Sequence, residues 1–66
     1  MPKQKRYAIK QDLEMAIHAI DRAQNHVAET RELYVDPHPE LAAALLTIFD
    51  MLEMARVGLE KFKDLV

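Results

Sequence analysis

The chain has no cysteine, no serine and no tryptophan, and its single glycine is Gly58. Without cysteine it has no disulfide, no thiolate metal site and no cysteine nucleophile. Without serine or a glycine-rich segment it has no serine nucleophile and no loop of the kind that cradles phosphate. We therefore expect no enzymatic activity, no catalytic residue and no cofactor.

Long apolar runs are missing as well. Asp50, Glu53 and Arg56 interrupt the richest apolar stretch, so no segment approaches the ~20 apolar residues of a membrane span. The N-terminus is basic but lacks the continuous apolar core and the cleavage site of a signal peptide. These absences predict a soluble, cytoplasmic protein that does not bind a membrane.

The length of 66 residues limits the chain to one small domain. A chain of this size buries only about 60% of the surface that its unfolded form exposes, so its stability is marginal without further support. Small domains gain that support from disulfides, a structural metal or oligomerisation. Because disulfides are excluded, oligomerisation is the support that we expect.

One short segment, 35–38, separates two long stretches of helix-forming sequence, and it is followed directly by Pro39. Since a proline disfavours helical backbone in the residue before it, the first helix should end near Tyr34. Proline is well tolerated at the first position of a helix, so Pro39 is predicted to open the second one. The candidate N-caps of that helix are Asp36 and His38, of which aspartate is the better cap by type.

These signals predict one domain over 1–66, with helices over about 9–34 and 39–65. The cations near the N-terminus oppose the start of a helix, because the positive end of the helix dipole prefers anions. Residues 1–8 are therefore predicted to be a basic, frayed segment outside the first helix.

Both predicted helices carry a seven-residue apolar repeat, typical of helices that pack along a seam. The seam of the second helix is predicted to be Leu41, Leu45, Ile48, Leu52, Ala55, Leu59, Phe62 and Val66. In the first helix a column of large residues, Leu13, Ile20, Val27 and Tyr34, alternates with Ile9, Ala16, Ala23 and Thr30. Matched lengths and a short loop predict an all-α fold, a two-helix antiparallel hairpin.

The second helix is apolar over more than its seam, since Met51 and Phe49 lie on opposite flanks of it. One amphipathic helix cannot cover a face this wide, so a lone hairpin would expose an apolar patch. A two-fold homodimer that closes into a four-helix bundle is the simplest solution, and the alternatives are a tetramer and a complex with another helical protein. The predicted interface consists of Leu45, Ile48, Phe49, Met51, Leu52, Ala55, Leu59 and Phe62.

Glu14, His18 and Asp21 share one face of the first helix and raise the alternative of a metal-binding bundle. We expect this face to lie opposite the seam and to be solvated, because metal sites of helical bundles project inward. No metal ligand is therefore assigned. His26, near Gln24 and Thr30, is predicted to be a half-exposed residue without a special role, and the alternative is a buried polar cluster that fixes the register.

Four of the nine basic residues lie within the first ten positions, which contain no acidic residue. The cations Lys3, Lys5, Arg6 and Lys10 are the candidate contacts to nucleic acid. The rest of the chain is acidic and would repel a polyanion, so nucleic acid is the less favoured partner. The function that we expect is a small self-associating interaction or regulatory module, and the alternatives are a nucleic-acid-binding dimer and, third, a metal-binding bundle.

Overall fold

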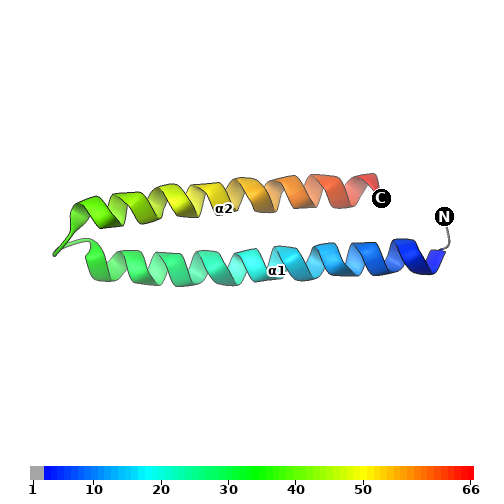
Figure 1. Cartoon of the computed structure of the whole chain (residues 1–66), viewed down its shortest axis with the longest axis horizontal. Helices are drawn as coiled ribbons and strands as arrows, with labels where there is room; N and C mark the ends of the chain where they lie inside the picture. Colours follow the sequence, from blue (N-terminus) through cyan, green and yellow to red (C-terminus); the bar gives the residue numbers. More distant parts are fainter. Residues whose placement is uncertain (1–2) are drawn as a thin grey trace.

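The computed structural model describes the backbone of residues 3–66 and the side chains of residues 5–66. Two helices, α1 over Lys3–Tyr34 and α2 over Pro39–Leu65, lie side by side and run in opposite directions (Figure 1). The chain is therefore an all-α helical hairpin in which the start of α1 and the end of α2 lie at the same end.

The turn between the helices is organised by the backbone of His38. Its N–H donates to the carbonyl of Tyr34 at 2.9 Å, and its carbonyl accepts the N–H groups of Leu41 and Ala42 at 3.0 and 3.1 Å. His38 occupies the N-cap position without a side-chain cap, and Pro39 follows as the first helical residue. The proline has no N–H to leave unsatisfied there, so it suits this position.

Helix α1 begins at Lys3, earlier than the start near residue 9 that the basic charges predict. Its first turn contains no acidic residue, so the helix dipole is uncompensated there. Lysine, glutamine, arginine and alanine are all good helix formers, and nothing in the segment breaks the helix. As a result α1 extends past the end of α2 (Figure 1), and residues 5–8 are exposed.

The face of α1 that packs on α2 is largely the predicted one. Its half-buried or buried residues are Ile9, Leu13, Ala16, Ile17, Ile20, Ala23, Gln24, Val27, Arg31 and Tyr34. Thr30, which was expected in the seam, is exposed, and its hydroxyl donates to the carbonyl of His26 at 2.9 Å. Arg31 is half-buried in its place.

The face of α2 that packs on α1 is rotated from the predicted seam. Its half-buried or buried residues include Ala42, Leu45, Phe49, Leu52, Arg56, Leu59, Lys63 and Val66. The leucine column 45, 52 and 59 was predicted correctly. The other predicted seam residues Leu41, Ile48, Ala55 and Phe62 are more exposed than this column, so they lie towards the edge of the contact rather than at its centre. Their place beside the leucine column is taken by Ala42, Phe49, Arg56 and Lys63.

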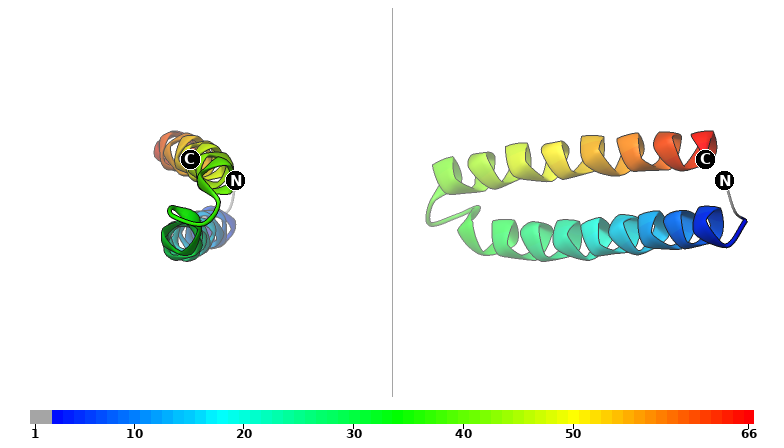
Figure 2. Two further views of the ribbon diagram at one scale, coloured as in Figure 1. Left: turned by 90° about the vertical axis from the view of Figure 1, so that its left-hand side faces the viewer. Right: turned by 45° about the vertical axis from the view of Figure 1, so that its right-hand side comes forward.

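The hairpin has a thin core. Only Ala42 and Gln24 are buried in the described part of the chain, and no large side chain there is fully buried. The accessible surface is 5253 Å², whereas a folded monomer of 7.6 kDa should expose about 4,300 Å². The radius of gyration is 15.7 Å, against about 11 Å for a compact domain of this length. Figure 2 shows why: two helices lie in a single layer with nothing covering either side.

Candidate self-association surface

The two long sides of the hairpin differ in chemistry. On one side, polar groups of α1 bond to polar groups of α2, and we call it the ion-pair side. Its members are Glu14, Asp21 and Gln24 of α1 and Glu53, Arg56 and Lys63 of α2. The other side, which we call the apolar side, has no cross-helix ion pair among the described residues.

Arg56 is the centre of the ion-pair side. Its guanidinium reaches Asp21 of α1 at 3.5 Å and Glu60 of α2 at 2.8 Å, and it also pairs with Glu53. The hydrogen bond from Gln24 and the contact with Arg56 lower the pKa of Glu53. The Glu53 carboxylate in turn raises the pKa of Arg56. The long apolar stem of arginine can pack between the helices while its charged head meets carboxylates at the edge.

Lys63 makes the second cross-helix ion pair, with Glu14 at 2.8 Å. This hydrogen bond lowers the pKa of Glu14 and raises that of Lys63. The expectation that Glu14 and Asp21 lie opposite the seam is therefore wrong, because both reach α2 at the edge of the contact. His18, which was grouped with them, is exposed.

Gln24 is the one buried polar residue of the described side chains, with 6% of its surface exposed. Its amide donates to a carboxylate oxygen of Glu53 at 3.0 Å and, at 3.4 Å, to the backbone carbonyl of Phe49. A buried polar group that needs a partner at one height favours one register of the two helices. His26 takes no part in this bond and is exposed, with Glu29 of its own helix 3.9 Å away.

The apolar side is dominated by an uninterrupted line of residues along α2, which we call the apolar stripe. Its members are Leu41, Ala44, Ile48, Met51, Ala55, Gly58, Phe62 and Leu65. They recur at alternating steps of three and four, the spacing of a coiled-coil seam, and all eight are exposed. A contiguous apolar line of this length is rare on the surface of a monomer and marks an interaction site.

Helix α1 contributes small side chains to the same side of the hairpin. Ala16 and Ala23 belong to the predicted small column, and Ala19 lies beside them on the same face. Small residues allow a neighbouring helix to approach closely. The apolar side is thus open to another helical element along its whole length.

The structure divides the predicted interface residues into two groups. Leu45, Phe49, Leu52 and Leu59 are half-buried between the helices, where they hold the hairpin together. Ile48, Met51, Ala55 and Phe62 are exposed and belong to the apolar stripe. The apolar stripe also contains Leu41, Ala44, Gly58 and Leu65, which are not among the predicted interface residues.

The candidate nucleic-acid residues lie at the free end of α1. Lys5, Arg6 and Lys10 are exposed there, on the part of the helix that extends towards and past the end of α2. The side chain of Lys3 is outside the described residues. No base-reading or phosphate-binding geometry follows from this placement alone.

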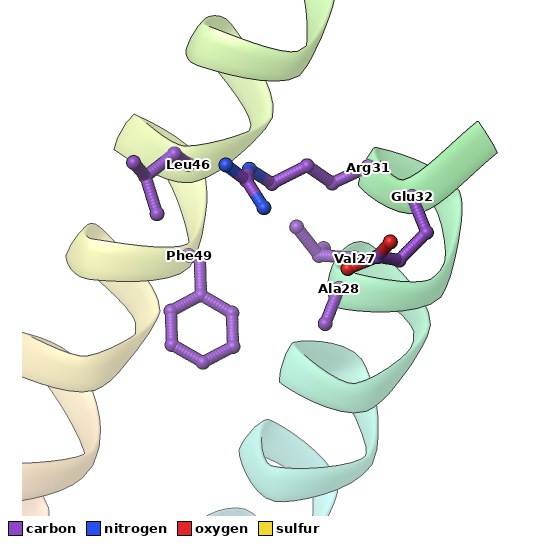
Figure 3. A pocket seen from close by; sticks show the side chains of 6 residues that line it. All are labelled: Val27, Ala28, Arg31, Glu32, Leu46 and Phe49. Atoms are coloured by element: carbon purple, nitrogen blue, oxygen red, sulfur yellow. The ribbon is translucent and has the colours of Figure 1, made fainter. Parts of the chain in front are cut away.

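The hairpin has a small hollow on the ion-pair side near the loop (Figure 3). It is lined by Val27, Ala28, Arg31, Glu32, Leu46 and Phe49 and has a volume of about 180 Å³. Ligand pockets usually measure about 300–1,000 Å³, so this hollow is too small for most cofactors. Arg31 reaches across it towards Leu46, and its Nε is buried without a hydrogen-bond partner.

The described part of the chain contains neither a candidate metal site nor a helix that could span a membrane. Its His, Asp and Glu residues form no group of three that could hold a metal ion. Within residues 3–66, neither helix has the length and apolar character needed to cross a bilayer. Comparison with protein-family models, curated proteins and solved structures gave no match.

Proposed function

We propose that this chain is a self-associating helical module in which two hairpins join through their apolar sides to form a four-helix bundle. In this proposal it has no catalytic activity of its own and acts as an interaction or regulatory unit. The observation that carries the proposal is the apolar stripe, a line of residues with coiled-coil spacing that the hairpin leaves exposed along its length.

The amount of exposed surface also supports the proposal. The chain exposes roughly 1,000 Å² more than the about 4,300 Å² that a compact monomer of its mass should expose. A stable protein interface buries about 800 Å² on each partner. The excess is therefore of the size that one interface removes from water.

The distribution of charge also favours the apolar side as the side that a second copy covers. The ion-pair side presents charged groups that already bond to each other, and covering them would cost desolvation. The apolar side requires no such cost, because its stripe contains no charged residue. A second copy is the simplest occupant, since closed two-fold dimers are the commonest oligomers.

Two methionines provide a matched test. Met51 lies in the apolar stripe and is 62% exposed, and Met15 lies outside the stripe, on α1, and is 63% exposed. In a lone hairpin Met51→Glu and Met15→Glu should behave alike. We expect Met51→Glu to convert the dimer to monomer in analytical ultracentrifugation, and Met15→Glu to sediment as the wild type. A Met51→Glu chain that still sediments as a dimer would overturn the proposal.

A further inference from the structure

The order of large and small residues in the apolar stripe allows it to match a second copy of itself that runs in the opposite direction. In such an antiparallel pair, each stripe residue faces the residue of the other copy that lies equally far from the middle of α2, close to Glu53, on the opposite side of that middle. The pairs are Leu41 with Leu65, Ala44 with Phe62, Ile48 with Gly58, and Met51 with Ala55. Three of the four pairs join a large side chain to a small one, which is how facing layers interdigitate.

A parallel arrangement of the same stripes lacks this match. Each residue would then face its own copy, so Phe62 would meet Phe62 while Ala55 and Gly58 would form two adjacent layers with almost no side chain. Overfilled layers and voids both destabilise a packed interface. The order of sizes therefore favours the antiparallel arrangement.

Gly58 is a second, independent indication. A glycine inside a helix lowers helix stability relative to alanine, so a contact that needs the missing side chain would compensate for this loss. The hairpin itself supplies none, because a Cβ placed on Gly58 would meet nothing within 4 Å. In the antiparallel arrangement the partner's Ile48 lies over this glycine and fills the space.

The neighbouring helix allows the close approach that this arrangement needs. Gln24 bonds to Glu53, so the part of α1 around Gln24 lies level with the middle of the stripe. On the apolar side that part of α1 carries the small residues Ala19 and Ala23, next to which a second hairpin can sit, and the exposed His26 follows them along the same face.

We infer that α2 of one hairpin packs antiparallel against α2 of a second copy along the apolar stripe, about a two-fold axis beside Glu53. This inference rests on the proposed self-association and specifies its geometry. Large residues of one copy lie over small residues of the other, and α2 with its copy forms the central contact of the bundle.

The absence of cysteine makes a cross-linking test direct. Thr47 and Lys61 are exposed polar residues that border the stripe, so Thr47→Cys and Lys61→Cys leave every stripe contact intact. In the antiparallel arrangement position 47 lies beside position 61 of the partner. Two copies of position 61 are then ~24 Å apart along the axis, at a rise of ~1.5 Å per residue.

The variants are first shown to be helical and dimeric by circular dichroism and ultracentrifugation, and are then treated with a short bis-maleimide, alone and mixed. We expect a cross-linked dimer in the mixture of Thr47→Cys and Lys61→Cys, at least tenfold more abundant than with either variant alone. Cross-linking of Lys61→Cys alone would show parallel helices and overturn the inference, while self-association would stand. Dimers that cross-link in neither case would exclude a contact between the two α2 helices. Monomers at every concentration would overturn the proposed function as well.

Discussion

The ion-pair side and the apolar side of the hairpin are built from the same two helices but differ in whether side chains of α1 and α2 form polar contacts across the edge. On the ion-pair side, Arg56 and Lys63 reach carboxylates of α1, so the edge of the contact is closed by groups that tolerate water. On the apolar side the stripe of α2 has no such partner and is exposed. The difference shows that, among the described residues, cross-helix polar contacts close only the first side, and it supports the proposal that another helix covers the second.

The largest effect is expected where the two sides share a core. Leu52 lies half-buried at the middle of α2, between the α1 contact and the stripe. Leu52→Ala should lower the free energy of unfolding by about 2–5 kcal/mol, because it leaves a cavity at the centre of the bundle. Chemical denaturation measures it, with Met15→Ala, outside the stripe on α1, as the control, expected within about 0.5 kcal/mol of the wild type.

Substitutions of the two phenylalanines should distinguish the roles of the two sides. Phe49 is half-buried against α1, and Phe62 is half-exposed in the stripe. Phe49→Ala should lower hairpin stability by about 2–3 kcal/mol, below the value for full burial because the ring is partly exposed. Phe62→Ala should instead weaken dimerisation, measured as a higher dissociation constant in sedimentation equilibrium. Equal effects of both variants on that dissociation constant would contradict the division into two sides.

Removing the buried amide of Gln24, which favours one register of the two helices, should lower the free energy of unfolding by a smaller amount. Gln24→Ala deletes the hydrogen bonds to Glu53 and to the Phe49 carbonyl. We expect a loss of about 1 kcal/mol, the typical contribution of such a bond, in urea denaturation. Gln24→Met keeps the packing volume and should lose the same bonds, so a wild-type stability of that variant would argue against a role for the amide.

The ion-pair side predicts a pH dependence. Partners in the folded state lower the pKa of Glu14 and Glu53 below the usual 4.5, so their ionised forms favour folding. Their contribution is present above pH 4.5 and is lost as the pH falls through the lowered values. Glu53→Gln and Glu14→Gln should therefore flatten the acid side of the stability curve slightly. Asp50→Asn removes an exposed carboxylate that makes no ion pair in the described part of the chain, and it serves as the control for the loss of one charge.

The smallest effect is expected at the free end of α1. Deleting residues 1–6 removes the start of α1, where this helix extends past the end of α2 (Figure 1), so the melting temperature and dimerisation should stay nearly unchanged. The same deletion tests the nucleic-acid alternative, since it removes three basic residues of the N-terminal cluster. Salt-sensitive RNA or DNA binding by the full chain that the deletion abolishes would favour that alternative over the module proposed above.

The two helices and their turn could be predicted because they depend on residues that are close together in the sequence. Pro39 and the segment before it interrupt the helix, and heptad spacing gives the inward face of α1. The start of α1 was misplaced because the unfavourable charges at its end did not outweigh good helix-forming residues. Such end effects are small and depend on solvent exposure.

The face of α2 could not be chosen from apolar spacing alone. The leucine column 45, 52 and 59 is flanked on one side by an apolar column that contains Ile48 and on the other side by a mixed column that contains Arg56. From hydrophobicity alone, the apolar column is expected to pack on α1. In the structure the mixed column packs there. The signal that was available is a mirrored spacing: Glu14, Asp21 and Gln24 are separated by seven and three residues, as are Lys63, Arg56 and Glu53. In an antiparallel pair this spacing brings each residue level with its partner.

The central claim, that the apolar side is covered by a second copy, is tested most directly by the mass of the chain in solution. Sedimentation equilibrium of the wild type should give twice the 7.6 kDa chain mass at micromolar concentration, and dilution should lower the helix content as the dimer dissociates. A stable, fully helical species of single chain mass over the same concentration range would contradict it.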